Sequence, residues 1–276
     1  MSRLARATWR RHDSGSCHLT KPAGSLGRLE DISCQVAGIQ RRETPRIEKK
    51  WVVVAAADYG VTDEGVSAFP QTVTAQMVAN FLNGGAAVSA LARQARARVK
   101  IIDAGVANPI PGDTSELVEL KVENSTQNFT LGPAMPRAHA VEIVDRGAEL
   151  SLELSKEGAD LIAISEMGIG NATAASAITA VMLGELPKTV TGHGTGIEEV
   201  TRLKKVHPVS RAISVNQPNF GLPARLFAET HGSAIVVRIG RVRAKNRQRM
   251  RERHQSTSAT VTSSRCSKSA TMRQAT

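Results

Sequence analysis

Three apolar runs of strand length mark the chain, at Trp51–Ala57, Val99–Ala104 and Asp160–Ser165. Their apolar positions are continuous rather than alternating, which is typical of strands covered on both faces in a parallel sheet. Each run ends next to glycine or polar residues. Helical segments alternate with these runs, so the pattern predicts an α/β fold: a doubly wound, mainly parallel sheet with flanking helices.

Apolar residues recur at helical spacing in several further segments. The predicted helices are Leu26–Ile39, Gln71–Leu82, Ala86–Arg98, Ala138–Glu157 and Ala172–Leu183. The segment Asn108–Pro136 contains four prolines and many polar residues, so we expect a long irregular loop there.

The charge of the chain is concentrated at one end. The 276 residues carry a net +11, but residues 241–276 alone hold eight Arg, two Lys and one acidic residue, which leaves the remainder at +2. This segment is also rich in Ser and Thr, so we expect a disordered basic tail. Such a tail can attract RNA or an acidic surface, although it has no aromatic residues for base stacking.

Other compositional features point to a protein without a membrane span. No apolar run approaches the roughly 20 residues that a membrane helix needs. Residues 1–16 are Arg-rich but lack an apolar core, so we expect a flexible extension rather than a secretory signal. Cys17, Cys34 and Cys266 show neither metal-ligand spacing nor a disulfide framework, which favours a reducing cytoplasm.

A glycine loop follows the third predicted strand and precedes a predicted helix. Glu166 comes just after the strand, followed by Gly168, Gly170 and Asn171, a candidate N-cap, and Thr173 can add a hydroxyl. Glycines allow close backbone approach, and a helix N-terminus offers N–H groups to an anion. The spacing is neither the dinucleotide nor the P-loop motif. We interpret the loop as a phosphate cradle; the alternative is an ordinary turn with a solvated Glu166.

A second glycine loop, Thr191–Gly196, is weaker evidence for a site. Its residues are small, and His193 can be an exposed turn residue as readily as a ligand. Lys204 and Lys205 follow; they can form a solvated helix face, or one of them can neutralise a phosphate.

Acidic residues cluster after the first predicted strand, at Asp58, Asp63 and Glu64. Metal binding is possible for them, but no histidine accompanies them. Capping of the next helix and hydrogen bonding within the loop are the favoured interpretations, and we expect neither a metal nor a cofactor.

Several motifs together carry a resemblance that runs in order from about residue 20 to residue 219. They are Thr20–Glu30, Ala57–Gly60, Glu64–Ser67, Val73–Met77, Asn83–Ala87, Gly132–Met135, Glu166–Thr173, Arg211–Ile213 and Asn216–Asn219. The chain resembles the nicotinate-nucleotide–dimethylbenzimidazole phosphoribosyltransferases. This resemblance implies transfer of phosphoribose from nicotinate mononucleotide to 5,6-dimethylbenzimidazole, giving α-ribazole 5′-phosphate and nicotinate for the lower ligand of cobalamin.

The resemblance also implies roles for particular residues and a homodimeric assembly. Glu166 is the catalytic candidate left in this sequence. The nucleotide-holding positions are Gly168, Gly170, Asn171, Thr173 and Lys205, and the positions lining the benzimidazole pocket are Phe69, Pro70, Gln76 and Met77.

The resemblance stops after Asn219, where the family's later motifs and its principal catalytic glutamate do not appear. We interpret this change as a shifted reading frame or truncated gene. The expected organisation is an extension (1–16), a helical segment of a small domain (17–48), an α/β nucleotide-binding core (49–219), an unmatched segment (220–240) and the basic tail (241–276). Three hypotheses follow: an active transferase, an inactive remnant that binds nucleotide, and a binder of RNA or acidic surfaces through the tail.

Overall fold

The computed structural model describes residues 20–22 and 24–218. They fall into two units, one containing residues 20–43 and the other residues 44–218. The first unit contains α2 (Arg28–Gln40), which confirms the helix predicted from Leu26 to Ile39. Lys21 Nζ lies 2.8 Å from Glu30 Oε1 and ties the approach segment to the first turn of this helix.

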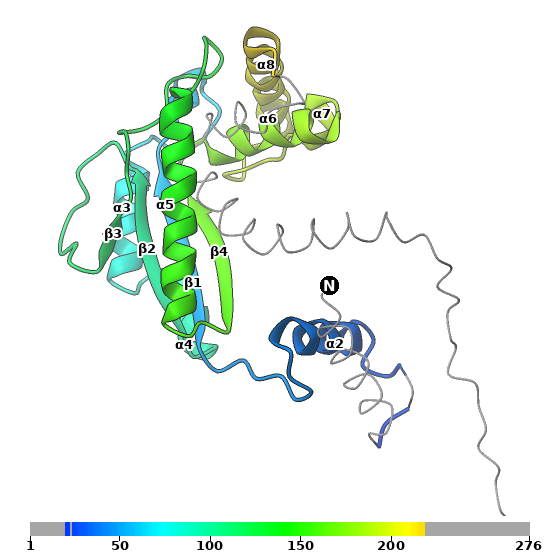
Figure 1. The fold of residues 1–276 in the computed structure, drawn as a ribbon. Coiled ribbons are helices and arrows are strands. Elements are labelled where there is room, and N and C mark those ends of the chain that lie inside the picture. The colour runs from blue at the N-terminus through cyan, green and yellow to red at the C-terminus, as the bar shows by residue number, and fades with distance from the viewer. Residues whose placement is uncertain (1–19, 23, 219–276) are drawn as a thin grey trace, which may run out of the picture. The chain divides into compact units, whose positions relative to one another are not determined.

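The second unit is built on a four-stranded parallel sheet (Figure 1). The strands are β1 (Lys50–Ala57), β2 (Ala97–Gly105), β3 (Leu117–Glu119) and β4 (Leu161–Met167), in the order β3-β2-β1-β4. The three predicted strands and the parallel α/β architecture are confirmed. The sequence did not predict β3, because a three-residue strand is too short to show a periodicity.

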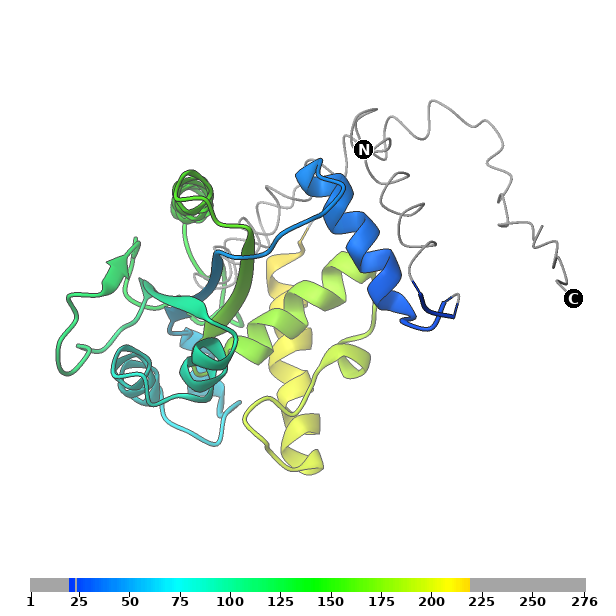
Figure 2. The ribbon, with the colours of Figure 1, turned by 90° about the horizontal axis from the view of Figure 1, so that it is seen from below.

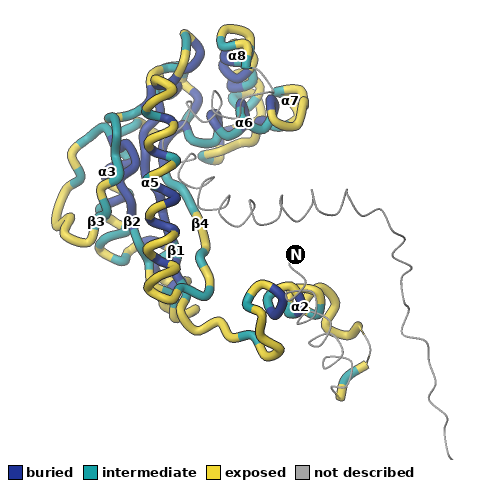
Figure 3. Tube along the Cα trace, in the orientation of Figure 1, coloured by how far each residue is buried: buried dark blue, intermediate teal, exposed yellow. Residues whose placement is uncertain are grey.

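Helices cover both faces of the sheet, as the continuous apolar runs require. On one face α5 (Arg137–Lys156) packs Ile143 and Leu154 against Val53. On the other face α3 (Val73–Leu82) packs Val78 against Val54, and α4 (Ala87–Gln94) lies on the same side (Figure 2). Most of β1 is therefore buried (Figure 3).

The helix predicted from Ala86 to Arg98 ends earlier than its sequence indicates. In the structure α4 stops at Gln94, Arg96 adopts a left-handed turn with φ 51°, and β2 begins at Ala97. Ala and Arg favour helix, but pairing of β2 with β1 begins at Ala97 opposite Lys50. Tertiary hydrogen bonding thus overrides local propensity at this boundary.

Three helices gather beyond the carboxyl ends of the strands: α6 (Asn171–Leu183), α7 (Pro187–Val190) and α8 (Glu199–Asn216) (Figure 1). Ala177 of α6 and Val209 of α8 share a buried cluster with Tyr59 and Phe129. The 3-10 turn η1 (Gly60–Glu64) follows β1 and adds Val61 to this cluster. The cluster fixes α6 and α8 above the strand ends.

Several expectations fall on residues outside the described part of the chain. These are the extension at 1–16, Cys17, Cys266, the unmatched segment and the basic tail with its RNA hypothesis. Within residues 20–22 and 24–218, no helix is long and apolar enough to cross a bilayer.

Candidate functional site

The strand order creates a switch point between β1 and β4, where ligands bind in open α/β sheets. Tyr59 follows β1 and donates its hydroxyl to Glu166 Oε2 at 3.0 Å. The prediction that the strand ends at Ser165 is wrong, because β4 continues to Met167 and Glu166 pairs opposite Ala55. Strand pairing with β1 extends β4 past the apolar run. Glu166 is therefore a half-buried, oriented carboxylate at the switch point rather than a solvated turn residue.

The first glycine loop is pressed against the end of β1. A methyl group on Gly168 would lie 2.0 Å from the carbonyl oxygen of Ala57. Gly170 has φ 96°, a conformation that favours glycine. Between them, the Ile169 N–H donates to Thr74 Oγ1 at 3.1 Å. Glycine is needed here for close packing and backbone shape, so both glycines fix the path of the chain into α6.

The start of α6 differs from the predicted N-cap arrangement. The capping residue is Gly170, and Asn171 is the first helical residue, so the N-cap assignment of Asn171 is wrong. Its Oδ1 instead accepts the Ala172 N–H at 2.6 Å, and the Thr173 N–H donates to the Gly170 carbonyl at 3.0 Å. These amides are already engaged, in contrast to the expected free donors. The fully buried Thr173 Oγ1 has no hydrogen-bond partner within the described residues.

The second glycine loop brings Lys205 to the start of α6. A methyl group on Gly194 would lie 2.9 Å from Lys205 Nζ and 3.3 Å from Ala172 Cβ, so these three residues meet. Lys205 is only 3% exposed, whereas Lys204 is exposed. Lys204 therefore lies on a solvated helix face, as one interpretation expected, whereas Lys205 is buried; its action on a phosphate stays a prediction.

Burial lowers the pKa of Lys205, and no acidic neighbour counteracts this shift. No hydrogen bond or ion pair to its ammonium occurs within the part of the chain that the structure describes. A buried charge without a partner is costly, so such a cation is suited to an anionic ligand. Lys205 and the positive end of the α6 dipole border the same junction, and Thr173 belongs to the first turn of that helix.

The proposed benzimidazole segment adjoins this junction through its backbone. The Ala68 N–H donates to Thr195 Oγ1 of the second glycine loop at 3.2 Å. Among the predicted pocket residues, Phe69, Pro70 and Gln76 are exposed and Met77 is half-buried on α3. Two open grooves of about 760 and 460 Å³ are lined by other residues. The pocket assignment therefore stays a prediction.

The acidic cluster after β1 makes hydrogen bonds within loops. Asp58 Oδ2 accepts the Ala107 N–H at 2.8 Å, and burial raises the pKa of Asp58. Glu64 Oε1 accepts hydrogen bonds from Asn128 Nδ2 and Thr130 Oγ1, both at 2.8 Å. No acidic side chain caps α3, so that part of the interpretation is wrong, while loop hydrogen bonding is confirmed. Within residues 20–22 and 24–218, no group of three or more His, Cys, Asp or Glu residues could hold a metal ion.

Sequence reasoning missed three residues that shape the site. Tyr59 orients Glu166, Thr74 accepts from the first glycine loop, and Thr195 joins the second loop to the segment before α3. Their partners lie about a hundred residues away in sequence, so local patterns cannot reveal the contacts. For Tyr59, its place at a strand end was the available signal.

A parallel α/β sheet with glycine loops and a buried cation at its switch point is typical of enzymes that bind phosphorylated ligands. Consistent with this class, residues 2–251 match the model of a protein family described as phosphoribosyltransferase. The chain belongs to this phosphoribosyltransferase family.

Individual relatives give a more specific comparison than the family model does. The nicotinate-nucleotide–dimethylbenzimidazole phosphoribosyltransferase of Chloroflexus aggregans is 48% identical over 215 residues, which cover 78% of this chain and 60% of that protein. The protein of the same name from Desulforamulus reducens is 48% identical over 202 residues, which cover 73% of this chain and 57% of that protein. The crystal structure of CobT from Thermus thermophilus superposes with a TM-score of 0.76 at 40% identity, covering 86% of this chain and 69% of that one. The chain thus spans about 60% of the length of these curated relatives.

Proposed function

We propose that this protein transfers phosphoribose from nicotinate mononucleotide to 5,6-dimethylbenzimidazole, forming α-ribazole 5′-phosphate and nicotinate. The observation that carries the proposal is the buried Lys205 ammonium beside Gly194 and Ala172, with no acidic partner among the described residues. A 5′-phosphate would supply the missing negative charge. Family membership and the names of the relatives support the same substrates.

Glu166 is the proposed base. In the reaction, the C1′–nitrogen bond to the pyridinium breaks and nicotinate leaves with the bonding electron pair, so the leaving group needs no proton. One benzimidazole nitrogen attacks C1′ while the other nitrogen loses its proton to a carboxylate. The Tyr59 hydroxyl, 3.0 Å from Glu166 Oε2, holds that carboxylate in a fixed orientation at the switch point.

The remaining site assignments divide between phosphate and base. Gly168, Gly170, Asn171 and Thr173 shape the phosphate end around the start of α6. The benzimidazole is assigned to the segment containing Phe69, Pro70, Gln76 and Met77. The hydrogen bond from Ala68 to Thr195 supports this division, because it connects the segment to the second glycine loop.

We further propose that the protein works as a cytoplasmic homodimer. The absence of a disulfide pattern in the sequence supports the location, and the resemblance to the family supports the dimer. Light scattering of the purified full chain tests the dimer, and a monomeric mass would contradict it.

Product formation tests the proposed reaction. The full chain is incubated with nicotinate mononucleotide and 5,6-dimethylbenzimidazole, and α-ribazole 5′-phosphate is measured by chromatography with mass detection. We expect product with the parent protein and much less with Glu166→Gln. Nucleotide binding without product would contradict the enzyme proposal and favour a binding-only protein. If neither is observed, the phosphate site is wrong as well.

A further inference from the structure

The second glycine loop needs an external constraint to hold one conformation. Residues Thr191–Gly196 include three glycines, and two of them have positive φ, 62° at Gly194 and 79° at Gly196. Glycine loses more conformational freedom on ordering than any other residue. Because Gly194 lies against Lys205, disorder of this loop would leave the proposed phosphate site without a fixed geometry.

Arg202, in the first turn of α8, supplies such a constraint. Its guanidinium binds both carboxylate oxygens of Glu199 at 2.6 and 2.7 Å. The same group donates to the Thr191 carbonyl at 2.9 Å and to the Lys188 carbonyl at 3.3 Å. One planar group thus joins α8 to the end of α7 and to the first residue of the loop.

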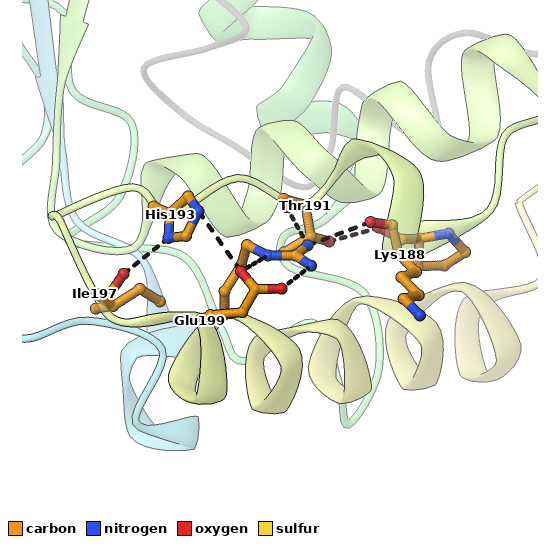
Figure 4. A network of polar contacts seen from close by, with 7 residues as sticks. Lys188, Thr191, His193, Ile197 and Glu199 are labelled. Carbon is orange, nitrogen blue, oxygen red and sulfur yellow. Dashed lines mark hydrogen bonds and ion pairs between the residues drawn. The ribbon is translucent and has the colours of Figure 1, made fainter.

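The loop is held at a second point through His193 (Figure 4). Its Nδ1 donates to the Ile197 carbonyl at 2.8 Å, which turns Nε2 toward Glu199 Oε2 at 3.7 Å. Glu199 therefore faces Arg202 on one side and the loop histidine on the other. Isolated surface ion pairs contribute little to stability, so we expect this network to act mainly by fixing the position of the second glycine loop.

Arg202 and Lys205 are three residues apart on α8 and lie on neighbouring positions of one helix face. We propose that Arg202 and Glu199 are positioning residues for the phosphate site: the pair fixes the second glycine loop so that Lys205 and the start of α6 meet the same phosphate. This inference rests on the proposed function, because the ligand is the phosphate of that function's nucleotide substrate.

Two substitutions distinguish a positioning role from a purely electrostatic effect on phosphate binding. Arg202→Lys keeps the positive charge but loses the planar fork that reaches the carboxylate and the carbonyls together. Glu199→Gln removes a negative charge near the site, so electrostatics alone predicts tighter phosphate binding. Positioning predicts the opposite. For both variants we expect affinity for nicotinate mononucleotide to fall about tenfold or more, as for loss of one charge-assisted constraint.

A chemically matched pair on α5 provides the control. Arg146 donates to the Leu120 and Lys121 carbonyls at 3.1 and 2.9 Å and to Glu142 at 2.6 Å. This arrangement repeats the chemistry of Arg202 on another helix. Arg146→Lys and Glu142→Gln should leave nucleotide affinity unchanged.

Calorimetry on the full chain measures affinity for nicotinate mononucleotide, ribose 5-phosphate and inorganic phosphate. Hydrogen exchange measures protection of residues 191–197 against that of β1. We expect the Arg202 and Glu199 variants to lose affinity for all three ligands and to exchange faster in the loop alone, with β1 protection unchanged.

The outcomes distinguish the two proposals. If the parent protein binds the phosphates but not the nucleotide, the proposed function fails, and the positioning role is still decided by the phosphate affinities of the variants. Unchanged affinity, tighter binding by Glu199→Gln, or an equal loss in the α5 controls would overturn the positioning role. Absence of binding to every ligand by the parent protein would overturn both.

Discussion

Replacing Lys205 by methionine should make the protein more stable and less able to bind phosphate. Methionine fills a similar volume, but it removes the ammonium of a residue that is only 3% exposed, whose pKa burial lowers. No neighbouring carboxylate is left unpaired by the change, because no acidic group contributes to the pKa shift of Lys205. The substitution therefore relieves a desolvation cost without creating a new one.

The two effects differ in size and sign. Relief of a buried, unpartnered polar group is worth about 1–2 kcal/mol in favour of the folded state. For a protein of this size, about 1 kcal/mol corresponds to a rise in Tm of about 2–4 °C. Loss of a hydrogen bond to a charged phosphate costs about 1.5–3 kcal/mol of binding free energy, or about 10- to 150-fold in Kd.

Calorimetry with two ligands isolates the phosphate contribution. Nicotinate mononucleotide carries the 5′-phosphate, and nicotinate riboside lacks it. Lys205→Met should weaken only the nucleotide. Lys204→Met is the matched control, since Lys204 is the exposed neighbour on the same helix, and it should change stability by less than about 0.5 kcal/mol.

Two results would refute this reasoning. Equal loss of affinity for the nucleotide and the riboside would mean that Lys205 does not act on the phosphate. A fall in Tm would mean that its ammonium has a stabilising partner in the folded protein.

Four further predictions follow from the site. The pKa of Lys205 lies below its usual value in the free protein, and a bound phosphate should raise it. Affinity for the nucleotide should therefore be highest at pH values below the Lys205 pKa of the free protein and should fall above it. Calorimetry in two buffers should detect the proton that the protein takes up on binding. Burial raises the pKa of Asp58, so the folded protein holds the carboxyl proton to higher pH than the unfolded chain does. The free energy of unfolding should therefore decline as pH rises from about 4 through the folded-state pKa. In denaturant titrations Asp58→Asn should remove this decline, and an unchanged pH profile of the variant would contradict the prediction. Gly168→Ala should destabilise the fold by about 3 kcal/mol or more, because its methyl group would lie 2.0 Å from a backbone oxygen; Gly192→Ala, with open space around it, is the control for the shift in denaturation midpoint. Glu166→Gln should slow product formation by about 10²-fold or more while nucleotide affinity is retained, and comparable rates would exclude it as the base.

Much of the fold could be predicted because it depends on local pattern. The continuous apolar run at Trp51–Ala57 requires cover on both faces, and the structure places α3 and α5 on opposite sides of β1. Glycines at 168 and 170 were interpreted as a phosphate cradle, with a tight turn as the alternative; the structure shows that both lie close to neighbouring residues, and a ligand at the loop stays a prediction.

Boundaries and partners depended on tertiary contacts. Because of pairing with β1, β2 begins inside the segment that was predicted as a helix, and β4 continues past Ser165. Glu166 is therefore a strand residue. Neighbouring Lys204 and Lys205 are indistinguishable by pattern, yet only Lys205 turns inward, toward Gly194 and Ala172.

The sequence by itself determined three of the four strands, most of the described helices and the parallel sheet, because periodicity and glycine placement act over a few residues. Only the tertiary structure decided which lysine is buried, which hydroxyl reaches Glu166 and which arginine holds the second glycine loop. Those contacts join segments that are far apart along the chain or separated by a turn, and their geometry exists only once β1, β4, α6 and α8 have packed together.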